Sequence, residues 1–163
     1  MSNSIGLQES EILELLASRY RDSYYDLYPG FSKVKKLDIE YAFETKKSAY
    51  REVNEVLNLF DGMPKEVTLY RTIQCKDEND VDLVAPGLCW SFNEKSAVRF
   101  SQDNLGKNTF LISCKTAKNN INWVVTIRQY LEYSGVGIAD SEDEIRVGNE
   151  SMLVDVKVLK KIK

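Results

Sequence analysis

The sequence predicts an α+β fold, with helices in the first half of the chain and a mostly antiparallel β-sheet in the second. Apolar residues follow helical spacing up to about residue 60, and they change to the alternating spacing of strands from Val67 onward. Helices that precede a group of strands are typical of an α+β domain. The length of 163 residues fits one domain with its own core. We therefore expect a single domain, with a helical part at 1–64 and a mainly β core at 65–163.

Two helices are expected in the helical part. Apolar residues at helical spacing predict the first helix from Ile12 to the Pro29-Gly30 turn. A longer and more regular helix begins near Asp38, a residue that suits an N-cap. Its apolar stripe continues to Phe60, and Gly62 and the proline two residues later end it.

Alternating apolar and polar residues predict the strands of the β core. The expected strands are Val67–Ile73, Gly87–Asn93, Phe110–Cys114 and Met152–Leu159. Two helical segments are expected between them, at Glu94–Gln102 and at about Trp123–Tyr133.

The residue content excludes several kinds of protein. Net charge is −3, so bulk electrostatics do not favour nucleic-acid binding. The absence of histidine excludes Ser-His-Asp and Cys-His catalysis and every histidine-ligated metal site. The three cysteines are widely spaced without a CxxC pair, which argues against disulfides and zinc and fits a reducing cytoplasm. No apolar run is long enough to span a bilayer, and Met1–Ser10 lacks the pattern of a signal peptide.

Arg71 has an unusual position for a charged residue. It alternates in phase with the apolar residues Leu69 and Ile73, so its guanidinium is expected on the apolar face of the strand. A charge there needs a carboxylate or an anionic ligand as partner. The ordinary alternative is an arginine that extends to water or forms a structural ion pair.

The segment Gly87–Asn93 has two distinct faces. Bulky apolar residues such as Trp90 alternate with the small polar residues Cys89, Ser91 and Asn93. Such a strand packs into a core on one side and lines a ligand cleft on the other. An ordinary amphipathic strand explains the same pattern.

An acidic run enters the last part of the chain. On an extended backbone, Glu142 and Glu144 share one face, because alternate side chains point the same way. Two neighbouring carboxylates repel each other, so a fold tolerates them mainly in water or at a reactive site. A solvated acidic turn is the ordinary explanation of the run Asp140–Glu144.

Taken in order, these three elements resemble the signature of arginine-type mono-ADP-ribosyltransferases. That signature has an arginine on a strand, then a Ser-x-Ser strand with a trailing helix, then Glu-x-Glu entering a strand. The matching segments are Leu69–Arg71, Cys89–Asn93 and Glu142–Ile145, with Cys89 in place of the first serine. The similarity covers most of the chain from Val67 onward, and the layout is most similar to phage-encoded members, which act as effectors or toxins on host proteins.

The resemblance implies a split antiparallel sheet that encloses a cleft for NAD, which serves as co-substrate. Cleavage of the nicotinamide–ribose bond of NAD builds positive charge on the sugar. By the resemblance, Glu144 is a catalytic residue that stabilises this charge and holds a ribose hydroxyl. Glu142 is the second catalytic residue and positions the acceptor, which we expect to be a protein arginine.

The resemblance also implies which residues bind NAD. Arg71 would hold the phosphates or the nearby ribose. Ser91 and Cys89 would line the nicotinamide side and orient the catalytic carboxylate. Tyr70 and Trp90, which adjoin these positions in sequence, complete the expected binding set, and no metal is expected.

Three alternatives stay open at this level. The acceptor of the transferred ADP-ribose could be a nucleic acid instead of a host or cellular protein, or water, which would make the chain an NAD glycohydrolase. In the third alternative the chain is a non-catalytic interaction module on the same fold. Two features support that module: the thiol of Cys89, and a tyrosine cluster formed by Tyr20, Tyr24, Tyr25 and Tyr28.

Overall fold

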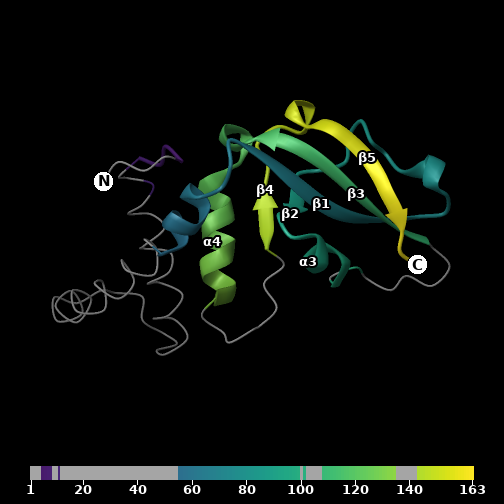
Figure 1. Cartoon of the computed structure of the whole chain (residues 1–163), viewed down its shortest axis with the longest axis horizontal. Helices are drawn as coiled ribbons and strands as arrows, with labels where there is room; N and C mark the ends of the chain where they lie inside the picture. Colours follow the sequence, from purple (N-terminus) through teal and green to yellow (C-terminus); the bar gives the residue numbers. More distant parts are fainter. Residues whose placement is uncertain (1–4, 9–10, 12–54, 100, 102–107, 135–142) are drawn as a thin grey trace, which may run out of the picture.

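The computed structural model describes residues 5–8, 11, 55–99, 101, 108–134 and 143–163 (Figure 1). These residues form an α+β arrangement around a five-stranded sheet of order β4-β2-β1-β3-β5. The strands are β1 (Glu66–Cys75), β2 (Cys89–Ser91), β3 (Asn108–Ala117), β4 (Glu144–Arg146) and β5 (Val154–Lys161). Every pairing within the sheet is antiparallel, so the predicted α+β class with a mostly antiparallel sheet is confirmed.

The long strands β1 and β3 are the centre of the sheet. They pair along their whole length, from Glu66 opposite Ala117 to Cys75 opposite Asn108. All residues from Thr109 to Cys114 are buried, although alternate residues of a strand point to opposite faces. Both faces of the sheet are therefore covered at β3.

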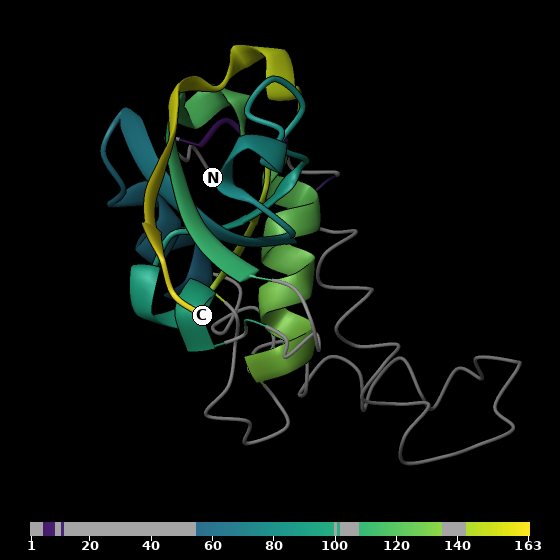
Figure 2. The same ribbon diagram turned by 90° about the vertical axis from the view of Figure 1, so that its right-hand side faces the viewer.

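In the described part of the chain, two α-helices that follow β1 pack beside this sheet. They are α3 (Glu94–Arg99) and α4 (Trp123–Ser134), with short 3-10 turns η1 (Glu78–Asp80), η2 (Lys118–Asn120) and η3 (Glu150–Met152). Figures 1 and 2 show α4 along the outer edge of β4. The amide of Arg146 donates to the Thr126 hydroxyl of α4 at 3.1 Å, and the Arg146 carbonyl accepts from the Asn122 amide at 2.8 Å. These bonds satisfy backbone groups that an edge strand otherwise leaves exposed.

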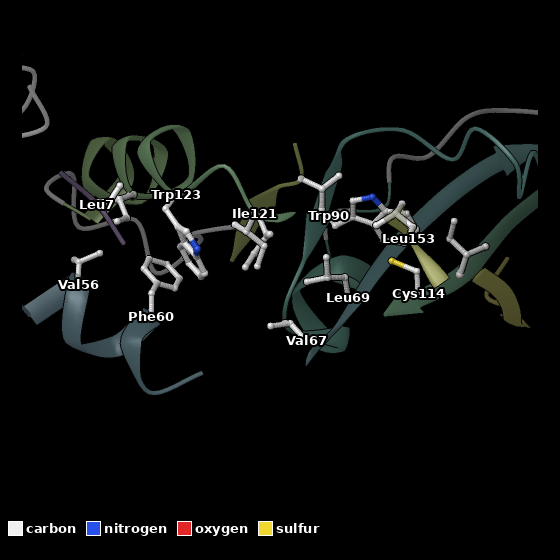
Figure 3. Close-up of a cluster of buried hydrophobic side chains, with 14 of the residues drawn as sticks. Leu7, Val56, Phe60, Val67, Leu69, Trp90, Cys114, Ile121, Trp123 and Leu153 are labelled. Carbon is white, nitrogen blue, oxygen red and sulfur yellow. The ribbon is translucent and has the colours of Figure 1, made fainter. Parts of the chain in front are cut away.

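The core joins the sheet to the helical segments (Figure 3). Leu69, Trp90 and Ile145 are buried side by side on one face of β1, β2 and β4. Residues 55–61 are helical and bring Phe60, which is fully buried, against Trp123 at a ring-centroid distance of 5.1 Å. Aromatic packing therefore ties this helix to the beginning of α4.

The predicted elements agree with the structure in type and differ at their ends. The second helix ends before Gly62 as expected, and the helical segment after residue 123 and the strand at Phe110–Cys114 are confirmed. The strand predicted from residue 87 is only Cys89–Ser91, because Gly87 has a left-handed backbone (φ 96°) and residues after Ser91 turn into α3. The last strand begins at Val154, since η3 occupies the preceding residues.

Several predictions fall outside the described residues. They are the first helix, the N-cap of the second helix, and the tyrosine cluster. In the part of the chain that is described, no helix is both long and apolar enough to cross a membrane.

Replacing Phe60 by alanine should lower the free energy of unfolding by about 3 to 5 kcal/mol, because a fully buried aromatic side chain leaves a cavity. Its neighbour Leu59 is 49% exposed, so Leu59→Ala should cost about 1 kcal/mol or less. Urea denaturation of both variants measures the difference. Equal losses would show that the aromatic contacts do not hold the helix to the sheet.

Candidate functional site

A pocket of about 190 Å³ lies between β1, β2, the start of β4, and α3. Its lining residues are Tyr70, Arg71, Thr72, Cys89, Trp90, Ser91, Ser96, Ala97 and Glu144. Six of the seven residues predicted from the sequence are thus brought together in one pocket. The seventh, Glu142, is outside the described residues.

Strand register explains how residues distant in sequence meet at this pocket. Tyr70 is opposite Ser91 in the pairing of β1 with β2, and Ser91 is opposite Glu144 in the pairing of β2 with β4. Side chains directly opposite each other lie on the same face of a sheet. Tyr70, Ser91 and Glu144 therefore form a row across three strands.

The pocket opens where two strands separate. Within the described residues, β1 and β2 pair at one position only, Tyr70 with Ser91. Continuation of that pairing would place Thr72 opposite Cys89, and both residues line the pocket instead. Helix α3 packs against β1 and β2 and closes one side through Ser96 and Ala97 (Figure 1).

Arg71 is held by a turn that precedes β2. Its Nη1 donates to the carbonyl of Pro86 at 2.6 Å. The next residue, Gly87, donates its amide to Glu150 Oε2 at 2.9 Å and accepts from the Trp90 indole at 2.9 Å. The φ of 96° at Gly87 favours glycine, and a side chain added there would displace the Arg71 guanidinium. The Pro86 carbonyl has no net charge, so the positive charge of Arg71 stays available to an anionic ligand.

Glu144 interacts with Cys89 across the two short strands. Burial raises the pKa of the Cys89 thiol, and the negative charge of Glu144 raises it further. A hydrogen bond between the thiol and this carboxylate acts in the same direction, whereas the charges of Arg146 and Arg71 lower the pKa. The thiol therefore stays protonated at neutral pH, close to the Glu144 carboxylate.

The Ser91 hydroxyl is directed to Asn93 and not to Glu144, the carboxylate that it was expected to orient. The hydroxyl donates to the Asn93 carbonyl at 3.0 Å and accepts from the Asn93 amide at 3.1 Å. A serine hydroxyl has one hydrogen to donate, and here it is used within the turn. Of the two small polar residues, Cys89 is the one with its hydrogen on the side of Glu144, although a thiol is the weaker donor.

The residue before Glu144 anchors the start of β4. Asp143 accepts from the Ser96 hydroxyl at 2.6 Å, and its carbonyl accepts from the Phe92 amide at 3.1 Å. Its φ of 48° is left-handed, so the expectation of an extended backbone through the acidic run is wrong at this residue. The strand begins only at Glu144, and the two contacts hold that beginning against α3.

Comparison of the chain with models of known protein families, with characterised proteins and with solved structures finds no match in any of the three. The interpretation of the pocket therefore depends on its own chemistry and on the motif resemblance.

Replacing Glu144 by glutamine should lower the pKa of Cys89 toward its ordinary value, because the charge that raises it is removed. Cys89 should then react faster with iodoacetamide at mildly alkaline pH, as measured peptide by peptide by mass spectrometry.

Two other thiols in the same protein serve as controls for this measurement. Cys114, whose pKa burial raises to about 12, should stay unreactive in both proteins, and Cys75 at the end of β1 should react at the same rate in both. An unchanged or slower rate at Cys89 would show that Glu144 does not contact the thiol.

Proposed function

We propose that this chain is an NAD-dependent mono-ADP-ribosyltransferase. It would transfer ADP-ribose from NAD to a protein acceptor, an arginine side chain, and release nicotinamide. The observation that carries this proposal is the convergence of a cation, a protonated thiol and a carboxylate in one pocket. The pocket residues Arg71, Cys89 and Glu144 come from three different strands, and the motif resemblance had assigned all three to NAD.

The residues present fit a substrate that carries anionic phosphates and a sugar that becomes positive. Arg71 supplies a cation whose own hydrogen bond is to a neutral carbonyl. Glu144 supplies the negative charge that stabilises a positively charged sugar, and the Cys89 thiol orients that carboxylate. NAD supplies the reactive bond, between the ribose carbon C1′ and the nicotinamide nitrogen; nicotinamide leaves with the bonding electrons, and the acceptor nitrogen bonds to C1′ and releases a proton.

The pocket volume limits how NAD would bind. Sites that enclose a drug-sized ligand have volumes of roughly 300 to 1,000 Å³. At about 190 Å³, this pocket suits one end of the dinucleotide, and the reacting end is the one that needs Glu144. The sheet around the pocket would then be the split core of the ADP-ribosyltransferase fold, with the pocket as its NAD cleft.

The cellular setting follows from the same proposal. A protein that uses NAD and modifies other proteins would act in the cytoplasm. Cys75, Cys89 and Cys114 form no disulfide, which fits a reducing compartment.

Replacing Glu144 by glutamine should abolish NAD cleavage and leave the thermal transition nearly unchanged, since Glu144 is only partly buried and the amide has the same shape. Nicotinamide release measures cleavage, and labelled ADP-ribose on protein in a bacterial lysate, located by mass spectrometry, measures transfer. Glu66→Gln is the control, because Glu66 is an exposed acid on β1 away from the pocket.

Three results of this assay would change the proposal. Full activity of Glu144→Gln would remove the catalytic assignment. Free ADP-ribose without labelled protein would identify an NAD glycohydrolase. Bound NAD that stays intact with the unaltered protein would identify a non-catalytic module.

Replacing Glu142 by alanine should reduce transfer to the acceptor more than hydrolysis of NAD, because this acid is proposed to position the acceptor guanidinium. Comparing labelled protein with free ADP-ribose in one reaction measures the two products together. Equal loss of both products would contradict this division of roles.

A further inference from the structure

Arg146 is a second arginine beside the pocket that the sequence motifs did not include. It is directly opposite Cys89 in the pairing of β2 with β4, and it follows Glu144 by two residues on β4. Side chains opposite each other, and side chains two residues apart on a strand, lie on one face of a sheet. Arg146 therefore lies on the face that presents Cys89 and Glu144.

The base of the Arg146 side chain is held firmly. Its backbone amide and carbonyl are bonded to Thr126 and Asn122, at the start of α4, and Thr126 is fully buried. The guanidinium thus extends from a backbone position that is fixed on its edge side by α4 and on its other side by β2.

The Arg146 guanidinium is partly buried and lacks a protein acceptor for one of its hydrogens. Its Nε is buried, and no described residue accepts a hydrogen bond from it. A buried donor without an acceptor is unfavourable, and buried polar groups normally have a partner. An anionic oxygen is the acceptor that best suits a guanidinium.

Arg146 and Arg71 act on the same part of the pocket. Both charges lower the pKa of the Cys89 thiol, and Arg146 has the larger effect. Arg146 is opposite Cys89 on the neighbouring strand, and Arg71 lines the same pocket as Cys89, so both charges can act on a negative group in this region. They come from β4 and β1, the two strands on either side of β2.

We propose that Arg146 and Arg71, from the two strands on either side of β2, together bind a diphosphate. Each guanidinium has a planar fork of N–H groups that matches the oxygens of one phosphate. The identification of this group as the diphosphate of NAD rests on the proposed function. The affinity of the two arginines for a diphosphate does not depend on the proposed function.

The test is isothermal titration calorimetry with inorganic pyrophosphate, ADP-ribose and nicotinamide riboside. In Arg146→Gln the affinity for pyrophosphate and ADP-ribose should fall about tenfold or more, because one charge-assisted contact is lost. Nicotinamide riboside has no phosphate, so its affinity should stay the same. Arg146→Lys should recover only part of the loss, since an ammonium lacks the fork. Lys157→Gln removes a cation from β5, at the opposite edge of the sheet, and should bind like the unaltered protein.

A second measurement shows that the variant is folded. Pyrophosphate should slow alkylation of Cys89 in the unaltered protein, because an anion nearby keeps the thiol protonated. The slowing should be much smaller in Arg146→Gln. Cys114 should stay unreactive in both proteins, which reports an intact core.

The results separate this inference from the proposed function. If pyrophosphate binding depends on Arg146 but NAD is not cleaved, the inference holds and the function fails. If Arg146→Gln binds pyrophosphate and ADP-ribose as tightly as the unaltered protein, the inference is wrong, whether or not NAD is cleaved. Absence of pyrophosphate binding by the unaltered protein would also overturn it.

Discussion

The separation of β1 from β2 is the constraint on which the pocket depends. In the described chain these strands share one pair, Tyr70 with Ser91, whereas β1 pairs with β3 along its whole length. Beyond that pair, β2 is held by β4, by the burial of Trp90 and by the bond of its indole to the Gly87 turn. β2 therefore keeps its position although it diverges from β1. Polar side chains of both strands line the gap between them.

The charges around Cys89 explain how a buried thiol stays protonated at this position. A thiolate at this position would repel Glu144, and burial together with that carboxylate keeps the thiol protonated. The protonated thiol remains a donor, although a weak one. The charges of Arg71 and Arg146, on either side of β2, lower the pKa of the thiol and so reduce the rise. One carboxylate and two cations therefore act on Cys89. Under the proposed function, this balance would suit a ligand that carries both a negative group and a developing positive charge.

The features predicted from sequence were those that local patterns determine. Helical spacing located α4 and the end of the helix at Phe60, and alternation located β1, β3 and β5. The motifs also predicted that Arg71 and Glu144 would meet, because the order of the three segments matched a known arrangement. Helical spacing and alternation depend on residues within a few positions of each other, which sequence displays directly, whereas the meeting of Arg71 and Glu144 was expected from the resemblance alone.

The features that the sequence did not predict depend on contacts between distant segments. The left-handed backbone of Asp143 becomes understandable only beside Ser96, and the turn at Gly87 only beside Arg71. A Pro-Gly pair is a turn signal, so the dipeptide at residues 86 and 87 could have marked the early end of the strand pattern. The position of Arg146 opposite Cys89 needed the strand register, which no local pattern contains.

The most direct test of the account uses the two tryptophans of the chain. Both indoles are buried and hydrogen-bonded, but Trp90 lines this pocket, whereas Trp123 packs against Phe60 and lines a different cavity. Titration of ¹⁵N-labelled protein with NAD should therefore shift the Trp90 indole N–H resonance and leave that of Trp123 in place. A shift of Trp123 alone, or no shift of either resonance at saturating NAD, would contradict the claim that this pocket binds the dinucleotide.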